Sequence, residues 1–235
     1  MLGHRGASAR APENTLGAFA LALDEGADGV ELDVRLARTG EVVVFHDTDM
    51  ARRAAAPGRL RAMTLTEIRA RDVGAGERVP VLDDVLDLVL GRGGLVNVEI
   101  KTDDVELESL ALATATLLMR RSLEQRARVI VSSFDAPMLE RVHVHAPELA
   151  LAFLFDDVHV PRAERERLER TLALAAVHPR ASLASAETVA AWHARGLAVN
   201  VWTVDAPAEL ARVSHAGVDA IVTNDPRGAL AALES

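Results

Sequence analysis

The sequence predicts a single (β/α)8 (TIM) barrel, and two observations indicate this fold. Short apolar runs alternate with longer helical patterns along the whole chain, which is typical of parallel strands joined by crossover helices. The length of 235 residues is close to that of one such barrel. Eight strands in alternation favour a closed barrel, although a miscount would also allow an open doubly wound sheet. We therefore expect one domain over residues 1–235.

The predicted elements run from one end of the chain to the other. The eight strands cover roughly Met1–His4, Val30–Val34, Val96–Ile100, Val129–Ser133, Leu149–Leu154, Leu174–His178, Ala198–Thr203 and Ala220–Thr223. The helices between them cover roughly Thr15–Glu25, Leu107–Arg120, Ala136–His145, Ala163–Leu172, Ala186–Arg195 and Pro207–Ala216. Residues 47–90 depart from this rhythm, because an extra strand at Val42–Phe45 is followed by an arginine-rich loop and two helical segments. We expect a small insertion there, after the second strand, at the barrel mouth.

Composition excludes several classes of function. The chain has no cysteine, so disulfides, zinc–thiolate sites and cysteine nucleophiles are excluded. A net charge of −9, with two tryptophans and no tyrosine, argues against a nucleic-acid partner. No apolar run approaches the length of a membrane span. Because no basic stretch and apolar run mark a signal peptide at the N-terminus, we expect a cytoplasmic enzyme.

Polar side chains share one face on two of the predicted strands. Side chains alternate along a strand, so Glu31 and Asp33 lie on one face, and Asn97, Glu99 and Lys101 lie together on one face of the next. In a parallel barrel the apolar face packs under the helices, so these polar sets project inward. Both sets lie toward the C-terminal ends of their strands, where active sites of such barrels are assembled.

The three carboxylates among these residues predict a metal site. Glu31, Asp33 and Glu99 repel one another at one mouth, and oxygen ligands select a hard ion, Mg²⁺ or Ca²⁺. Zinc is the weaker choice without thiolates, although a histidine ligand would allow it. The alternative is a buried ion pair without a metal, between Glu99 and Lys101 or between Asp33 and Arg35.

Two histidines stand directly after apolar strands and are candidates for acid–base catalysis. His4 ends the first strand, and His46 follows the extra strand. Histidine titrates near neutral pH, so a pair across one pocket can act as acid and base. Arg5 follows His4 and offers a fork suited to a phosphate. We expect the other six histidines to lie on the surface or in packing contacts: His143, His145, His159, His178, His193 and His215.

The basic residues contain one further signal. Of the 26 basic residues, 25 are arginine and only Lys101 is lysine. A compact ammonium differs chemically from a planar guanidinium, so this lysine beside Glu99 indicates a position where the difference matters. Chance retention is the alternative.

Seven short motifs occur in order along the chain: His4-Arg5-Gly6, Pro12-Glu13-Asn14-Thr15, Glu31-Leu32-Asp33, His46-Asp47, Glu99-Ile100-Lys101, Trp202-Thr203-Val204 and Thr223-Asn224-Asp225-Pro226. Together they resemble the glycerophosphodiester phosphodiesterase family, in its compact bacterial type. The resemblance covers nearly the whole chain, and the order of the motifs along the strands makes it specific. The two departures are a first strand that begins almost at Met1 and an asparagine, Asn224, where many relatives have an acid.

The resemblance implies a function and a role for each candidate residue. It implies metal-dependent hydrolysis of small-molecule glycerophosphodiesters to sn-glycerol 3-phosphate and an alcohol. By that resemblance, the three carboxylates hold a divalent metal, His4 and His46 carry acid–base chemistry, Arg5 and Lys101 contact phosphate, and Trp202 lines the pocket. Two alternatives remain: phospholipase D-like action on lysophospholipids or sphingomyelin, and a non-catalytic barrel that binds glycerophosphodiesters. The oligomeric state and the preferred head group stay open.

Overall fold

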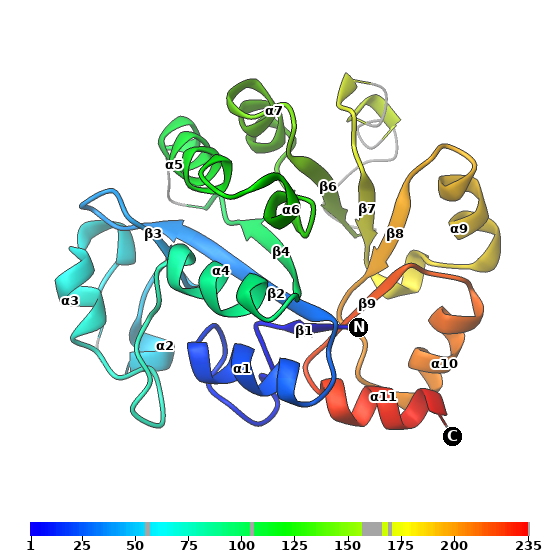
Figure 1. The fold of residues 1–235 in the computed structure, drawn as a ribbon, viewed down its shortest axis with the longest axis horizontal. Coiled ribbons are helices and arrows are strands. Elements are labelled where there is room, and N and C mark those ends of the chain that lie inside the picture. The colour runs from blue at the N-terminus through cyan, green and yellow to red at the C-terminus, as the bar shows by residue number, and fades with distance from the viewer. Residues whose placement is uncertain (55–56, 104–105, 157–165, 169–170, 235) are drawn as a thin grey trace.

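The structure, a computed structural model, describes residues 1–54, 57–103, 106–156, 166–168 and 171–234. Within these residues, parallel strands form one sheet in the order β1-β9-β8-β7-β6-β5-β4-β2. Because β1 pairs with both β9 and β2, the sheet closes on itself (Figure 1). The predicted (β/α)8 barrel is therefore confirmed, and the open sheet is excluded.

The barrel strands agree with the predicted ranges to within about two residues at most ends. They are β1 (Leu2–His4), β2 (Gly29–Leu36), β4 (Leu95–Ile100), β5 (Val129–Ser133), β6 (Ala150–Phe155), β7 (Ala176–Pro179), β8 (Ala198–Val201) and β9 (Ala220–Thr223). The second strand is longer than expected because its last residues, Val34 to Leu36, pair with the antiparallel strand β3 (Val42–Val44).

Helices surround the barrel in Figure 1. The helices between or after the barrel strands are α1 (Leu16–Asp24), α4 (Leu82–Gly91), α5 (Leu107–Met119), α6 (Leu123–Arg126), α7 (Ala136–His145), α9 (Ala186–His193), α10 (Pro207–His215) and α11 (Pro226–Glu234), with the 3₁₀ turn η2 (Ala181–Leu183). The sequence did not predict α6 or α11. Most of the predicted helix Ala163–Leu172 lies outside the described residues. None of the described helices is long and apolar enough to cross a membrane.

The alternation along β2 determines what each side chain contacts. Val30, Leu32 and Val34 are fully buried and belong to the same hydrophobic cluster as Phe19 of α1 and Val85 of α4. Burial of this apolar face against helices is the main force that holds such a layer together. The alternate residues of β2 consequently face the barrel interior.

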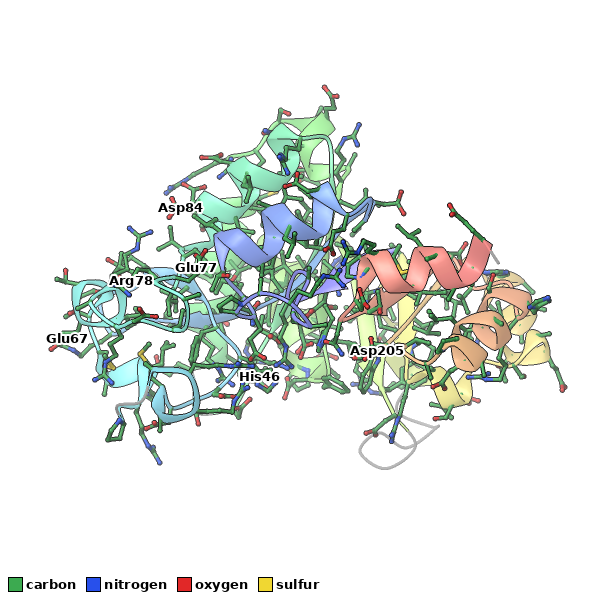
Figure 2. The ribbon with its side chains drawn as sticks, turned by 90° about the horizontal axis from the view of Figure 1, so that it is seen from below. His46, Glu67, Glu77, Arg78, Asp84 and Asp205 are labelled. Carbon is green, nitrogen blue, oxygen red and sulfur yellow. The ribbon has the colours of Figure 1, made fainter. Side chains whose placement is uncertain are left out.

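The segment between β3 and α4 adds a second, smaller hydrophobic cluster. It contains α2 (Ala51–Ala54), η1 (Leu60–Ala62) and α3 (Leu65–Arg69), and it projects to one side of the barrel in Figure 2. Its buried residues include Phe45, Met50, Leu60 and Ile68, and they form a cluster separate from the main core. The predicted insertion also included α4, but α4 packs in the main core as the crossover helix between β2 and β4.

Candidate active site

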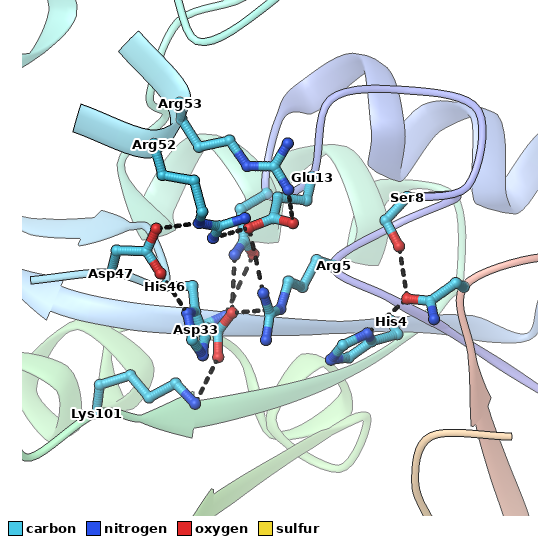
Figure 3. Close-up of polar contacts among 12 residues, drawn as sticks. His4, Arg5, Ser8, Glu13, Asp33, His46, Asp47, Arg52, Arg53 and Lys101 are labelled. Atoms are coloured by element: carbon cyan, nitrogen blue, oxygen red, sulfur yellow. Dashed lines mark hydrogen bonds and ion pairs between the residues drawn. The ribbon is translucent and has the colours of Figure 1, made fainter. Parts of the chain in front are cut away.

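A cavity of about 240 Å³ opens at the C-terminal ends of the barrel strands. Seven of the eight predicted site residues line it: His4, Arg5, Glu31, His46, Glu99, Lys101 and Trp202. The eighth, Asp33, is fully buried and is paired with Arg5 and Lys101, which lie on two sides of its carboxylate (Figure 3). The fold thus brings together all eight residues from separate segments of the sequence.

The three candidate metal ligands form one buried cluster. Each of Glu31, Asp33 and Glu99 offers a carboxylate oxygen within 4.8 Å of the other two. The strand register explains this proximity, because Asp33 of β2 lies beside Glu99 of β4 in a parallel pair. A group of three buried carboxylates requires compensating positive charge.

The raised pKa values of two of these carboxyl groups indicate that the protein does not fully compensate the charge of the cluster. Burial and the nearby Asp33 raise the pKa of Glu31 to about 8, and burial raises the pKa of Glu99 to about 7. Burial opposes the ionisation of Asp33 as well, but Lys101 and Arg5 hold the pKa of Asp33 well below its usual range. Glu31 Oε1 is buried and has no hydrogen-bond partner among the described residues. The donor set, all oxygen, therefore fits a hard divalent cation.

Arg5 and Lys101 converge on Asp33 from two sides. The Arg5 Nε atom lies 3.0 Å from Asp33 Oδ2, and the Lys101 Nζ atom lies 3.1 Å from Asp33 Oδ1. Lys101 also pairs with Glu99. The alternative Asp33–Arg35 pair does not form, because Arg35 binds Asp103 and donates a hydrogen bond to the His46 carbonyl.

The backbone at the end of β1 is arranged to present Arg5 to this cluster. Arg5 has a φ of 56° and Gly6 a φ of 84°, both in the left-handed region. A side chain at Gly6 would meet the backbone of Ala18 at about 2.5 Å, so the turn requires glycine. The turn directs the Arg5 N–H to the Glu31 carboxylate at 3.1 Å. A left-handed arginine of this kind is typical of strained functional positions.

Lys101→Arg tests whether the lone lysine is selected by its shape. Nζ sits between Asp33 and Glu99, and the side chain is only 14% exposed, so the broader guanidinium must displace one of them. We expect turnover to fall by about 100-fold with the fold intact, as for other small misplacements in active sites. Steady-state kinetics and a thermal unfolding curve would measure both. Arg92→Lys, an exposed pair with Asp24, serves as the control, and parent-like turnover of Lys101→Arg would mean that the lysine is accidental.

The two candidate catalytic histidines are held in the same way. His4 Nδ1 lies 2.7 Å from Asn224 Oδ1, and His46 Nδ1 lies 2.7 Å from Asp47 Oδ1. Since both partner atoms are acceptors, each Nδ1 donates, and neither Nε2 makes a hydrogen bond to the described residues, although His4 Nε2 lies 3.8 Å from Glu31 Oε2. Burial lowers the pKa of both histidines from the ordinary value. The partners differ in charge, because His46 is held by a carboxylate and His4 by a neutral amide.

Asn224 is held in place by a small network of hydrogen bonds that the sequence did not reveal. Its Nδ2 donates to Asp205 Oδ2 at 2.6 Å, and its backbone N–H donates to Asp205 Oδ1 at 2.8 Å. Ser8 also donates to Asn224 Oδ1. Asp205 thereby fixes the amide so that its oxygen faces His4. The motif around Asn224 pointed to this position, but no local signal identified Asp205 or Ser8.

A second network joins the extra segment to the barrel. Glu13 accepts hydrogen bonds from Arg5, Arg52 and Arg53, and Arg52 also pairs with Asp47 (Figure 3). These contacts connect α2 to the turn after β1 and to the partner of His46. The motif containing Glu13 was recognised in the sequence, but the arginines were not identified as its partners.

Asn14, from the same motif, supports Asp33 directly. Its Nδ2 donates to Asp33 Oδ2 at 2.8 Å, and its Oδ1 accepts from the Asp33 backbone at 3.3 Å. Thr15 is the N-cap of α1, and its side chain accepts a hydrogen bond from the Ala18 backbone N–H. Asn14 therefore belongs to the site, and Thr15 to the helix.

The opposite wall of the cavity is largely apolar. It comprises Phe134, Leu154, Trp202 and Val222, with the Phe134 and Trp202 rings edge to face at 5.3 Å between centroids. His178 also lines this wall, with 1% of its surface exposed. Of the two expected placements for His178, surface or packing, the structure excludes the surface, and it adds that the buried ring lines the cavity.

The remaining described histidines lie outside the cavity. In agreement with the prediction, they lie on three outer helices: His143 and His145 on α7, His193 on α9 and His215 on α10. His159 lies outside the described residues. Figure 2 labels His46 and Asp205 on one side of the barrel, the side on which the cavity lies.

Comparison with known proteins identifies the family. Residues 4–227 match the model of the glycerophosphoryl diester phosphodiesterase family. A glycerophosphodiester phosphodiesterase of Caldanaerobacter subterraneus is 35% identical over 96% of this chain and 94% of its own length. One of Bacillus altitudinis is 31% identical over 95% of this chain and 93% of its own length.

Solved structures agree in fold. An Oleispira antarctica phosphodiesterase, in complex with the product sn-glycerol-3-phosphate, has a TM-score of 0.91 and 28% identity, covering 100% of this chain and 96% of that one. A Thermotoga maritima glycerophosphodiester phosphodiesterase has a TM-score of 0.81 and 29% identity, covering 96% and 94%. With the acidic cluster and the paired histidines in one cavity, these matches show that the chain belongs to the glycerophosphoryl diester phosphodiesterase family, a family of phosphoric diester hydrolases.

Proposed function

We propose that this chain hydrolyses glycerophosphodiesters to sn-glycerol 3-phosphate and an alcohol, with Mg²⁺ or Ca²⁺ held by Glu31, Asp33 and Glu99. The observation that supports this most is the arrangement of one cavity, in which two histidines with open Nε2 atoms border the buried carboxylate cluster. That the Oleispira antarctica relative was solved with sn-glycerol-3-phosphate as its product supports the same product here.

The ionic wall of the cavity, formed by the carboxylate cluster with Arg5 and Lys101, binds the phosphate. The apolar wall, which contains Phe134 and Trp202, binds the glycerol carbons. Glu31, Asp33 and Glu99 would hold the divalent ion, which would supply Lewis-acid polarisation of the phosphoryl group when bound. Arg5 and Lys101, each about 85% buried at the edge of the cluster, stabilise negative charge that builds on the phosphoryl oxygens. Trp202, whose Nε1 is fixed by a hydrogen bond to the His178 carbonyl, packs against the substrate carbons.

The two histidines divide the proton transfers. His4, whose Nδ1 is held by a neutral amide, accepts the proton of the attacking hydroxyl on Nε2. His46, whose Nδ1 proton is held by the Asp47 carboxylate, gives a proton from Nε2 to the departing alcohol oxygen as the P–O bond breaks. The carboxylate stabilises the protonated ring of His46, which suits it to the role of acid.

A substrate panel tests the proposed function. We expect the purified chain with Mg²⁺ or Ca²⁺ to release sn-glycerol 3-phosphate from glycerophosphocholine, glycerophosphoethanolamine and glycerophosphoglycerol. Phosphorus NMR of the products distinguishes cleavage on either side of the phosphate. Lysophosphatidylcholine and sphingomyelin test the alternative lipid activity, and faster turnover of either lipid than of every glycerophosphodiester would replace the proposal. Binding without turnover of any diester would indicate the non-catalytic alternative.

A second experiment tests which hydroxyl attacks. Two histidines facing one phosphate, with a hydroxyl next to the ester, support attack by the substrate's own sn-2 hydroxyl, for which an internal nucleophile has a high effective molarity. A cyclic glycerol phosphate then forms as the alcohol leaves, and water opens it in a second step. We expect the 2-deoxyglycerol analogue of glycerophosphocholine to react at least about 100-fold more slowly at saturation. Equal turnover numbers for the two diesters would mean direct attack by water.

A further inference from the structure

One buried titratable group in the cavity has no part in the proposed proton transfers. His178 lies on β7, is 1% exposed and lines the otherwise apolar wall. Burial lowers its pKa to about 3, so the ring is neutral at any pH at which the protein would work. A neutral imidazole with one donor and one acceptor nitrogen is a hydrogen-bonding group, and two partners are needed to satisfy it.

Only one of these partners is present in the described part of the chain. His178 Nε2 lies 2.8 Å from Asn200 Nδ2, on the neighbouring strand β8. Among the described residues this is the one hydrogen bond of the His178 ring, and Nδ1 is not part of it. Buried polar groups in folded proteins are almost always paired, so the free nitrogen indicates that a ligand or water completes the ring.

The position of β7 in the barrel indicates which part of a substrate would contact His178. Going around the sheet from β7 to β2, three strands intervene in one direction, β6, β5 and β4, and three in the other, β8, β9 and β1. His178 is thus directly across the barrel from Glu31 and Asp33. A phosphate bound at the carboxylate cluster places the near end of the glycerol beside the ionic wall and the far end toward β7.

A hydroxyl is the group that suits this nitrogen. The orientation of the Asn200 amide decides whether Nδ1 carries a proton, and a hydroxyl can accept from a protonated Nδ1 or donate to a bare one. An ammonium or a carbonyl would suit only one of the two forms. The wall around His178 is formed by Phe134, Leu154 and Trp202, which contact carbon rather than charge.

We propose that His178 binds the terminal sn-1 hydroxyl of the glycerol group and so selects glycerol over other alcohols esterified to the phosphate. This inference rests on the proposed function, since it assumes that phosphate occupies the ionic wall. The sn-2 hydroxyl, adjacent to the ester, lies toward the histidines instead. His178 is then a specificity-determining residue, and the terminal hydroxyl is its ligand.

Paired substrates and variants test this assignment. The substrates are glycerophosphocholine and its 1-deoxy analogue, in which hydrogen replaces the terminal hydroxyl while the sn-2 hydroxyl remains. For the parent, we expect kcat/KM to be about tenfold lower with the analogue, the loss of one hydrogen bond to a buried group. His178→Leu should lower kcat/KM about tenfold with glycerophosphocholine but no more than about twofold with the analogue.

Further variants separate binding from a structural role. His178→Gln retains a donor and an acceptor and should retain discrimination between the two substrates to within about threefold of the parent. Asn200→Ala leaves the ring but removes the contact that orients it, so discrimination should fall at least about threefold even if His178→Leu does not fold. His215→Leu removes an exposed histidine whose ring bonds only to the Ala211 carbonyl, and it should behave like the parent.

The possible failures are distinguishable. Equal losses on both substrates in His178→Leu, or unchanged discrimination in Asn200→Ala, would assign His178 a purely structural role and overturn the proposal. If His178→Leu lost discrimination between glycerophosphocholine and its 2-deoxy analogue, and not between glycerophosphocholine and its 1-deoxy analogue, the choice of hydroxyl would be overturned. A parent chain that hydrolyses no glycerophosphodiester would overturn the proposed function, and this assignment with it.

Discussion

Removing any one carboxylate of the proposed metal site should abolish most of the activity. For Glu31→Gln, Asp33→Asn and Glu99→Gln we expect kcat/KM to fall at least about 1000-fold, because each variant loses a hard-ion ligand and the associated charge stabilisation. Excess chelator should inactivate the parent, and added Mg²⁺ or Ca²⁺ should restore it. The variants should need a higher metal concentration for any residual turnover.

Stability measurements separate this loss from misfolding. The pKa of Glu31, about 8, is above that of an ordinary glutamate, so without metal this group makes the native state less stable as pH rises from about 4.5 through 8. Glu31→Gln removes that charge, and its metal-free unfolding temperature at pH 8 should equal or exceed that of the metal-free parent. Added metal should raise the unfolding temperature of the parent more than that of the variant.

A matched carboxylate change gives the control for this experiment. Asp84→Asn alters an exposed residue of α4, paired with Arg69, and should leave both activity and metal response unchanged. Full parental activity in excess chelator would contradict the metal assignment.

Removing either of the two proposed catalytic histidines should have the next largest effect. We expect His4→Gln and His46→Gln to lower turnover by about 100- to 10,000-fold, the usual contribution of a positioned acid or base. Binding of sn-glycerol 3-phosphate should weaken far less, because Arg5 and Lys101 remain. His193→Gln, an exposed histidine of α9 paired with Asp219, is the control. Near-parental turnover of both site variants would exclude histidine acid–base catalysis.

The pH profile identifies which histidine is the acid. The Asp47 hydrogen bond raises the pKa of His46, against burial, which lowers it. Asp47→Asn keeps an acceptor for Nδ1 but removes the charge, so the pKa of His46 falls. If His46 must be protonated, activity is then lost at lower pH on the alkaline side. An alkaline limb that does not move, with a shifted acidic limb, would assign the acid role to His4 instead.

Much of the barrel and of the ionic wall was predictable because it depends on local alternation. A strand has a period of two, so the apolar and polar faces of β2 and β4 can be read directly from Val30–Val34 and Val96–Ile100. Parallel pairing with Asp33 beside Glu99 then brings the carboxylates together without further information. The predicted histidines were also recognisable, because each directly follows an apolar strand.

Contacts between distant segments were not predictable in this way. Asp205 orients Asn224 across the gap between the β8 and β9 ends, Glu13 gathers arginines from α2, and Asn14 reaches Asp33 through a left-handed turn. None of these pairings leaves a periodic trace in the sequence. Similarly, the sequence did not separate α4 from the rest of residues 47–90. The buried residues of α4 pack in the main core, whereas those of the preceding segment form the second cluster.

The sequence by itself thus determined the strand order, the inward carboxylates and the candidate histidines, because hydrophobic periodicity and strand termini are local properties of the chain. The tertiary structure alone decided the partner of each site residue, and it placed His178 in the cavity rather than on the surface. That placement depends on closure of the barrel, which sets β7 opposite β2 although Ala176 lies 147 positions after Gly29 in the sequence. Since closure is a property of all the strands together, no single segment could have revealed it.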